Sequence, residues 1–85
     1  MNTPDSQLIV HRFFLALDTL IATGEMRGAA TFTKEHGINR RNFHTTRIHP
    51  ESGMFQPAWL SYIVKDYGIS ARWLLTGLGN MQAQR

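Results

Sequence analysis

Three arginines gather in the segment HGINRRNFHTTRIHP, which runs from His36 to Pro50 and contains no acidic residue. The planar guanidinium group of arginine can donate two parallel hydrogen bonds to phosphate oxygens or to the major-groove edge of guanine. The six acidic residues are scattered over the rest of the chain, so the net charge of +3 understates how positive this segment is. These residue types predict a surface that binds nucleic acid.

Other chemistry has little support in the sequence. His36, His44 and His49 are eight and five residues apart, whereas metal ligands on one helical face are three or four apart, and the chain has no cysteine. The chain contains no phosphate-binding glycine loop and no nucleophile elbow, and Glu35 and Glu51 belong to different elements. We therefore expect no enzymatic activity, no metal, no cofactor and no small-molecule ligand.

The length of 85 residues predicts a single domain covering residues 1–85, and the share of hydrophobic residues, 42%, is typical of a globular protein. The most apolar run, Leu8 to Ala22, is interrupted by His11, Arg12 and Asp18, so it is too polar to cross a membrane. Absence of cysteine fits a reducing compartment. We expect a cytoplasmic protein that is neither exported nor bound to a membrane.

Apolar residues recur at helical spacing, and no run alternates with period two for long enough to indicate a strand. Capping residues and glycines divide this pattern into helices over about 4–23, 28–36, 40–48, 57–67 and 70–76. The tail from Asn80 to Arg85 is polar, and we expect it to fray. The predicted fold class is all-α, a compact bundle of four or five helices.

The helices predicted over 28–36 and 40–48 are short and joined through Gly37, which is the spacing of a DNA-binding helix-turn-helix. With Gly37 as the turn glycine, three apolar side chains should form the core of the motif: Phe32, Ile38 and Phe43.

Three polar residues occupy further inward positions of this motif. Thr33 stands where alanine or glycine normally allows two helices to approach, and His36 and Thr46 stand where apolar residues usually pack. We expect Thr46 to hydrogen-bond back to a carbonyl of its own helix and His36 to be partly exposed.

The outward positions of the helix 40–48 carry its charge. Arg40 and Arg41 lie in the first turn, the end that approaches the bases in this motif, while His44 and Thr45 follow one turn later and can reach bases or backbone. The residues that we expect to contact bases are Arg40, Arg41, His44 and Thr45. Those that we expect at the DNA backbone are Asn39, Arg47 and Arg27, with capping of the helix as the alternative role of the Asn39 amide.

A second segment, YGISARWLLTGLG from Tyr67 to Gly79, follows HGINRRNF at a suitable separation. Together they resemble the helix-turn-helix domains of phage Cro and repressor proteins, which have the lambda-repressor-like fold, and in particular the branch with a YG(I/V)SxxWLLTGxG segment. The resemblance implies binding to double-stranded DNA, as a homodimer on a two-fold symmetric site, and a role in transcriptional regulation. Any part of Trp73 or Leu74 left exposed would then mark the dimer surface.

Three functions thus remain open. The first is sequence-specific DNA binding by a transcriptional regulator, which the arginine cluster and the resemblance favour. A second is a protein-interaction module that keeps the fold but has lost DNA binding, as polar residues at inward positions would suggest. The third is a nucleic-acid binder without sequence specificity.

Overall fold

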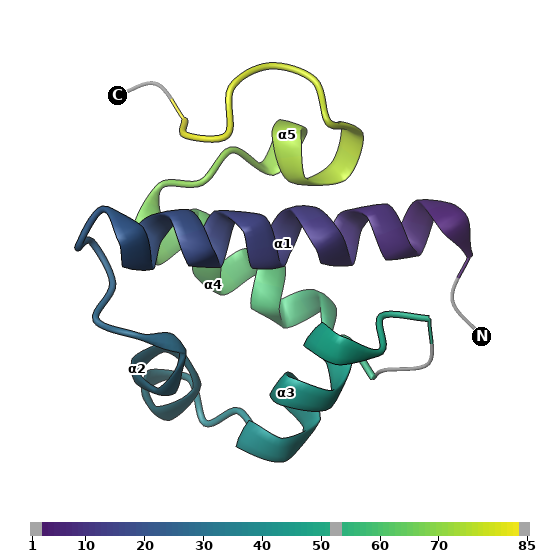
Figure 1. The fold of residues 1–85 in the computed structure, drawn as a ribbon. Coiled ribbons are helices and arrows are strands. Elements are labelled where there is room, and N and C mark those ends of the chain that lie inside the picture. Colours follow the sequence, from purple (N-terminus) through teal and green to yellow (C-terminus); the bar gives the residue numbers. More distant parts are fainter. Residues whose placement is uncertain (1–2, 52–53, 84–85) are drawn as a thin grey trace.

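Five α-helices form the regular structure of the computed structural model, which describes residues 3–51 and 54–83 (Figure 1). They are α1 (Pro4–Ala22), α2 (Ala29–Glu35), α3 (Arg40–Ile48), α4 (Pro57–Tyr67) and α5 (Ala71–Thr76). Within the described residues there is no strand, and the radius of gyration of 12.1 Å is that of a compact domain of this length, about 12 Å. The all-α prediction is confirmed, and each helix begins and ends within one residue of the expected position.

Local chemistry explains these ends. The Thr3 hydroxyl accepts a hydrogen bond from the Ser6 backbone N–H at 3.1 Å, and Pro4 occupies the first helical position of α1, where no N–H is needed. The Ser70 hydroxyl caps α5 in the same way. Gly68 ends α4 with a φ of 71°, a left-handed conformation that favours glycine.

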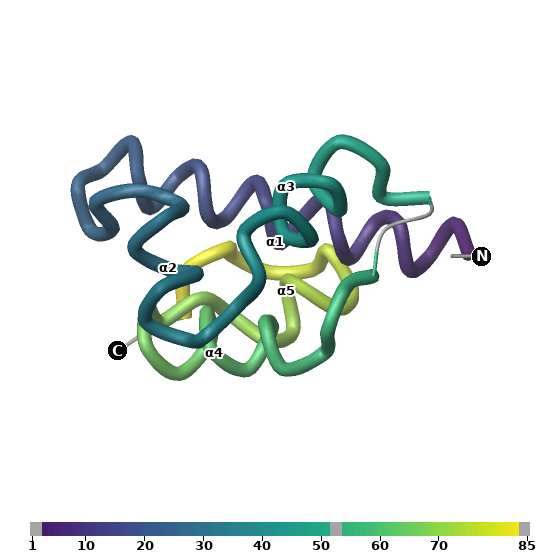
Figure 2. The backbone as a smooth tube through the Cα atoms, turned by 90° about the horizontal axis from the view of Figure 1, so that it is seen from below, coloured from purple at the N-terminus to yellow at the C-terminus, as the bar shows by residue number. Residues whose placement is uncertain are grey.

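The long helix α1 runs through the middle of the molecule, with α5 on one side of it and the α2–α3 pair on the other (Figures 1 and 2). Arg12 links α1 to α5, because its guanidinium donates to the Leu74 carbonyl oxygen at 3.3 Å. The described C-terminal segment lies on the same side of α1 as α5, away from α3 (Figure 1). One side of the molecule is thus formed by α2 and α3 without cover from α5.

The core is built around the ring of Phe13, which is fully buried. Five aromatic rings surround it at centroid distances of 5.1 to 6.2 Å, most of them edge-on: Phe14, Phe32, Phe43, Phe55 and Trp59. These rings come from α1, α2, α3, α4 and the segment before α4, so one cluster joins four helices. Edge-to-face pairs of this kind add to the stabilisation that burial alone provides.

The C-terminal segment differs from the expectation of a frayed tail. The Ser70 N–H donates to the Met81 carbonyl at 2.8 Å, and the Ala83 N–H donates to the Gly68 carbonyl at 2.8 Å, around an isolated bridge between Ile69 and Gln82. Met81 also packs against the core. The expectation was therefore wrong for residues 80–83, because backbone pairing and an apolar side chain hold them. Residues 84–85 lie outside the described part.

No helix among the described residues has the length and apolar character needed to cross a bilayer.

Candidate nucleic-acid interface

The chain turns between α2 and α3 over the residues His36 to Asn39. Gly37 makes the turn with a φ of 63°, where a side chain would be strained, and the Ile38 N–H donates to the Thr33 carbonyl at 2.9 Å. The Asn39 side-chain oxygen then accepts from the Asn42 N–H at 2.9 Å and caps α3. A glycine turn and a capping asparagine thus join two short helices directly.

The inner side of α3 is fixed to the core. Phe43 is buried among the rings of Phe13, Phe14 and Trp59, with centroid distances of 5.0 to 6.0 Å. Thr46 is fully buried, and its hydroxyl donates to the Asn42 carbonyl at 2.7 Å, the back-bond that the sequence predicted. Packing of these inner side chains therefore fixes α3 against the core.

Phe32 and Ile38 complete the inner side, with Phe32 fully buried and Ile38 partly buried against the core. Thr33, at the third polar inward position, is buried and donates to the Ala30 carbonyl at 3.1 Å. Its buried hydroxyl therefore has a hydrogen-bond partner inside its own helix.

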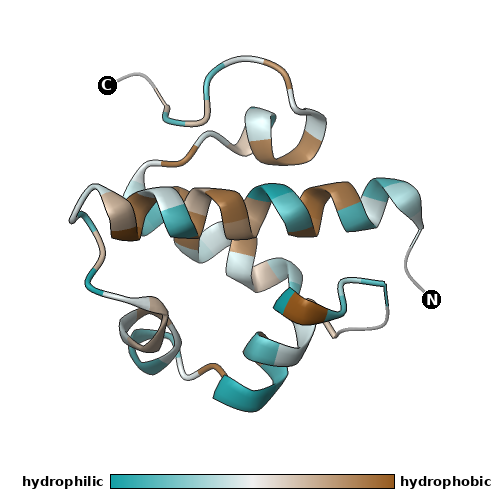
Figure 3. Cartoon of the chain, viewed as in Figure 1, coloured by the Kyte–Doolittle hydropathy of each residue, from teal (hydrophilic) through white to brown (hydrophobic). Residues whose placement is uncertain are grey.

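The outer side of α3 carries the side chains expected to contact bases, and all four are exposed: Arg40, Arg41, His44 and Thr45. Arg40 and Arg41 belong to no ion pair in the part of the chain that the structure describes. Figure 3 shows the first turn of α3 as one of the most hydrophilic stretches of the chain. Two guanidinium groups are therefore presented to solvent with their charge uncompensated.

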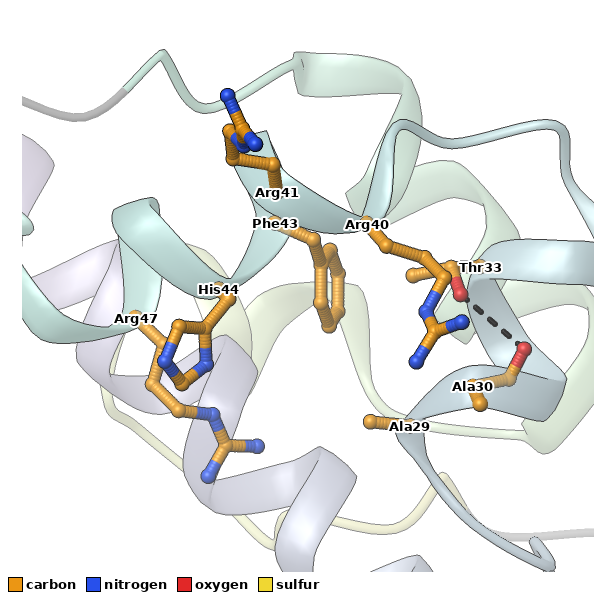
Figure 4. A pocket seen from close by; sticks show the side chains of 8 residues that line it. All are labelled: Ala29, Ala30, Thr33, Arg40, Arg41, Phe43, His44 and Arg47. Carbon is orange, nitrogen blue, oxygen red and sulfur yellow. Dashed lines mark hydrogen bonds between the residues drawn. The ribbon is translucent and has the colours of Figure 1, made fainter.

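A cleft of about 530 Å³ lies between α2 and α3. Residues with small side chains line it on α2, and mostly cationic residues line it on α3: Ala29, Ala30, Thr33, Arg40, Arg41, Phe43, His44 and Arg47. Arg40 points into the cleft towards Ala29 and Ala30, whereas Arg41 points away from it (Figure 4). Because no acidic side chain lines the cleft, its potential is positive, which suits a phosphate group or the edge of a base. The sequence analysis did not identify Ala29 and Ala30 as part of the site. Their small size was the only signal that could have indicated a cleft beside α2.

Arg47 was expected at the DNA backbone, but the structure places it in an intramolecular ion pair. Its two terminal nitrogens contact the two carboxylate oxygens of Asp18 at 2.8 and 3.3 Å, and its Cζ lies 4.8 Å from the centre of the Phe14 ring. This two-pronged contact joins α3 to α1 and compensates the charge of Arg47. Asp18 is 29 residues away in sequence, and no sequence signal indicated the pair. Arg27, by contrast, is exposed in the connection before α2.

The surface expected around α5 is placed differently from the prediction. Leu74 is fully buried and contributes nothing to a surface, because it faces the core together with Ile63 and Ile69. Trp73 is half-buried. The exposed apolar side chains of this region are those of Leu75 and Leu78, which are more than half exposed.

Tyr67, at the end of α4, donates a hydrogen bond to the Glu35 carboxylate of α2 at 2.9 Å. Burial, this hydrogen bond and the nearby charges of Glu35 and Asp66 raise the pKa of Tyr67 from 10.0 to about 12. Since the folded value is the higher one, Tyr67 stabilises the fold below about pH 10, and this contribution is lost as the pH rises from about 10 to about 12.

We expect the ultraviolet absorbance of the phenolate to show a transition near pH 12 that is missing in Tyr67→Phe. Glu35→Gln should lower the pKa of Tyr67, because it removes a charge-assisted hydrogen bond and a negative charge. An unchanged titration in Glu35→Gln would contradict the contact between α2 and α4.

No family model, curated protein or solved structure matches this chain. The functional assignment therefore rests on the geometry of α2, α3 and the cleft between them.

Proposed function

We propose that the protein binds double-stranded DNA in a sequence-specific manner, with α3 in the major groove, and acts as a transcriptional regulator of the phage-repressor type with a lambda-repressor-like fold. One observation carries this proposal. The inner side of α3 is locked into the core by Phe43 and Thr46, while its outer side presents Arg40 and Arg41 without ion-pair partners in the described residues. A rigid helix with free guanidinium groups has the properties that readout of base edges requires.

The major groove is about 12 Å wide and accepts one α-helix. Arg40 and Arg41 in the first turn would donate to guanine O6 and N7, and His44 and Thr45 would contact neighbouring bases or the backbone. Arg27 and Asn39 would bind phosphates, which position a protein on the duplex without reading its sequence. Arg47, held by Asp18, would orient α3 and leave the phosphates to these other residues.

Binding as a homodimer follows from the same proposal. Two copies on a two-fold symmetric site would place their α3 helices about 34 to 36 Å apart, one turn of B-DNA. Trp73, together with the exposed Leu75 and Leu78, offers an apolar surface for the contact between the copies.

The polar residues at inward positions favour no rival function, since each has a hydrogen-bond partner inside the fold. Thr33 and Thr46 bond to carbonyls of their own helices, and both ring nitrogens of His36 are occupied. These contacts explain how the motif packs with polar residues at inward positions.

Selection from a random pool of duplex DNA at near-physiological salt, followed by sequencing, tests the proposal. The wild-type chain should enrich an inverted repeat with half-sites about 10 bp apart. The double variant Arg40→Ala/Arg41→Ala should enrich nothing. The double variant Lys65→Ala/Arg72→Ala removes the same charge from α4 and α5 and should select the wild-type site.

Other outcomes would identify the two alternatives. Binding that is equal for all sequences and weakens uniformly in the arginine variant would indicate a non-specific nucleic-acid binder. No binding even at low salt would indicate a protein-interaction module and would overturn the proposal.

A further inference from the structure

His36 lies at the end of α2, directly before the turn, with only 10% of its side chain exposed. Both of its ring nitrogens have close partners. Nδ1 lies 2.8 Å from the carbonyl oxygen of Phe32, one turn back in α2, and Nε2 lies 2.7 Å from Oδ2 of Asp66 on α4. The imidazole thus bridges α2 to α4 at the point where the chain turns towards α3.

Both partners of the ring are hydrogen-bond acceptors. A carbonyl oxygen carries no hydrogen, and neither does an ionised carboxylate. A neutral imidazole has one N–H and one lone pair, so it could satisfy only one of them and would direct its lone pair at the other oxygen. Only the doubly protonated ring donates to both, and its bond to Asp66 is then charge-assisted.

Packing keeps the ring in this orientation. It stacks on Tyr62 of α4, with centroids 4.3 Å apart and planes 12° apart, and it lies 4.6 Å from the ring of Phe32. Ionisable groups beside this contact are Glu35 of α2 and Tyr67 of α4, which are hydrogen-bonded to each other. Lys34 and Lys65 precede Glu35 and Asp66 in sequence. Rotation of the imidazole into solvent would break the stack and both hydrogen bonds.

We infer that His36 is a positioning residue whose doubly protonated form ties α2 to α4 and thereby fixes the turn that sets the direction of α3. An apolar residue at this position would fill the space but would make neither hydrogen bond. A ring that carries only one N–H leaves one of the two oxygens without a donor, so the bridge between α2 and α4 is complete only when both nitrogens are protonated. The effect on the fold is independent of any ligand. The effect on DNA binding rests on the proposed function.

Unfolding by urea at about pH 5.5 and about pH 8, on either side of the interval in which histidines change charge, tests the effect on the fold. We expect the unfolding equilibrium constant to be larger at the higher pH. The increase should be roughly tenfold greater in the wild-type protein than in His36→Gln, because only the wild type loses a hydrogen bond of a charged group. Asp66→Asn should show the same reduced pH dependence. Asp66 is 55% exposed, so this variant removes the negative charge of the acceptor without disturbing the core.

His49 provides a matched control. It forms an ion pair with Glu51 at 3.3 Å, but both side chains are more than half exposed, and exposed pairs contribute little. His49→Gln should keep the wild-type pH dependence. An equal pH dependence in His36→Gln, Asp66→Asn and the wild type would overturn the inference.

One measurement needs no variant. Long-range proton–nitrogen correlation spectra of the imidazole rings at about pH 6 should show hydrogen on both nitrogens of His36. A nitrogen of His36 that carries a lone pair under these conditions, in the folded protein, would also overturn the inference.

DNA affinity for the selected site, measured at the same two pH values, tests the functional half. His44 is a second histidine on the proposed DNA surface, so His44→Gln serves as the common background. The affinity of His44→Gln for DNA should be lower at the higher pH. This decrease should be roughly tenfold greater than the decrease in the double variant His44→Gln/His36→Gln. Equal changes would overturn the coupling to DNA. If the unfolding results are as expected but no variant binds DNA, the role of His36 between α2 and α4 is supported. The proposed function would then be contradicted, and the inference about the fold would not.

Discussion

Replacing Phe13 by alanine should lower the free energy of unfolding by about 3–5 kcal/mol, the usual cost of removing a buried phenylalanine ring. Phe13 is fully buried, and it is the ring around which the other aromatic side chains of the core are arranged. Its loss would leave a cavity that the surrounding rings, fixed on four helices, can fill only in part. Because small domains have a total stability of about 5–15 kcal/mol, much of it would be lost.

Denaturation by urea, followed by far-ultraviolet circular dichroism, measures this effect. Leu15→Ala is the control on the same helix, since Leu15 is 53% exposed, and it should cost no more than about 0.5 kcal/mol. Phe13→Leu, which keeps part of the volume, should fall between the two. Similar losses in Phe13→Ala and Leu15→Ala would show that the core is not centred on Phe13.

Helix boundaries were predictable because the signals that set them are local. The cap at Asn39 and the left-handed glycine at Gly68 act within three or four residues of the helix end that they define. The burial of Phe32 and Phe43 followed from spacing alone, since a helix that packs on a core must place its apolar residues on one side.

Contacts between distant residues were not predictable from the sequence. His36 was expected to be partly exposed, and 10% of its side chain is accessible. Its hydrogen bond to Asp66, 30 residues later, had no signal in the sequence. The ion pair of Arg47 and the pairing of Ser70 with Met81 depend likewise on how whole helices pack. In each case the polar group is satisfied by a residue that only the tertiary structure brings near.

The three arginines of the candidate site differ in their surroundings. Arg40, Arg41 and Arg47 form one cluster in the sequence, but the structure gives each of them different neighbours. Arg47 is neutralised by Asp18, Arg40 points into the cleft beside α2, and Arg41 points away from it (Figure 4). Only Arg40 and Arg41 are therefore expected to contribute their full charge to a DNA complex.

Replacing either Arg40 or Arg41 by alanine should weaken binding to the selected site by about 1–3 kcal/mol, which is roughly 5- to 150-fold in Kd. A residue that contacts a base should lose this affinity on the selected site and much less on unrelated duplexes, because the contact distinguishes sequences. A residue that contacts a phosphate should instead weaken binding to all duplexes and reduce the salt dependence by about one counterion. Titrations of both variants over a range of salt concentrations, on the selected and on an unrelated duplex, separate the two roles.

Arg72→Ala is the matched control for these titrations, because it removes one exposed arginine from α5, across α1 from α3 (Figure 1). It should leave the ratio of specific to non-specific affinity unchanged. Base readout by both arginines requires that this ratio fall in Arg40→Ala and in Arg41→Ala. If it falls only in Arg41→Ala, and Arg40→Ala lowers the salt dependence instead, then the cleft between α2 and α3 holds a phosphate and the bases are read from the other side of α3.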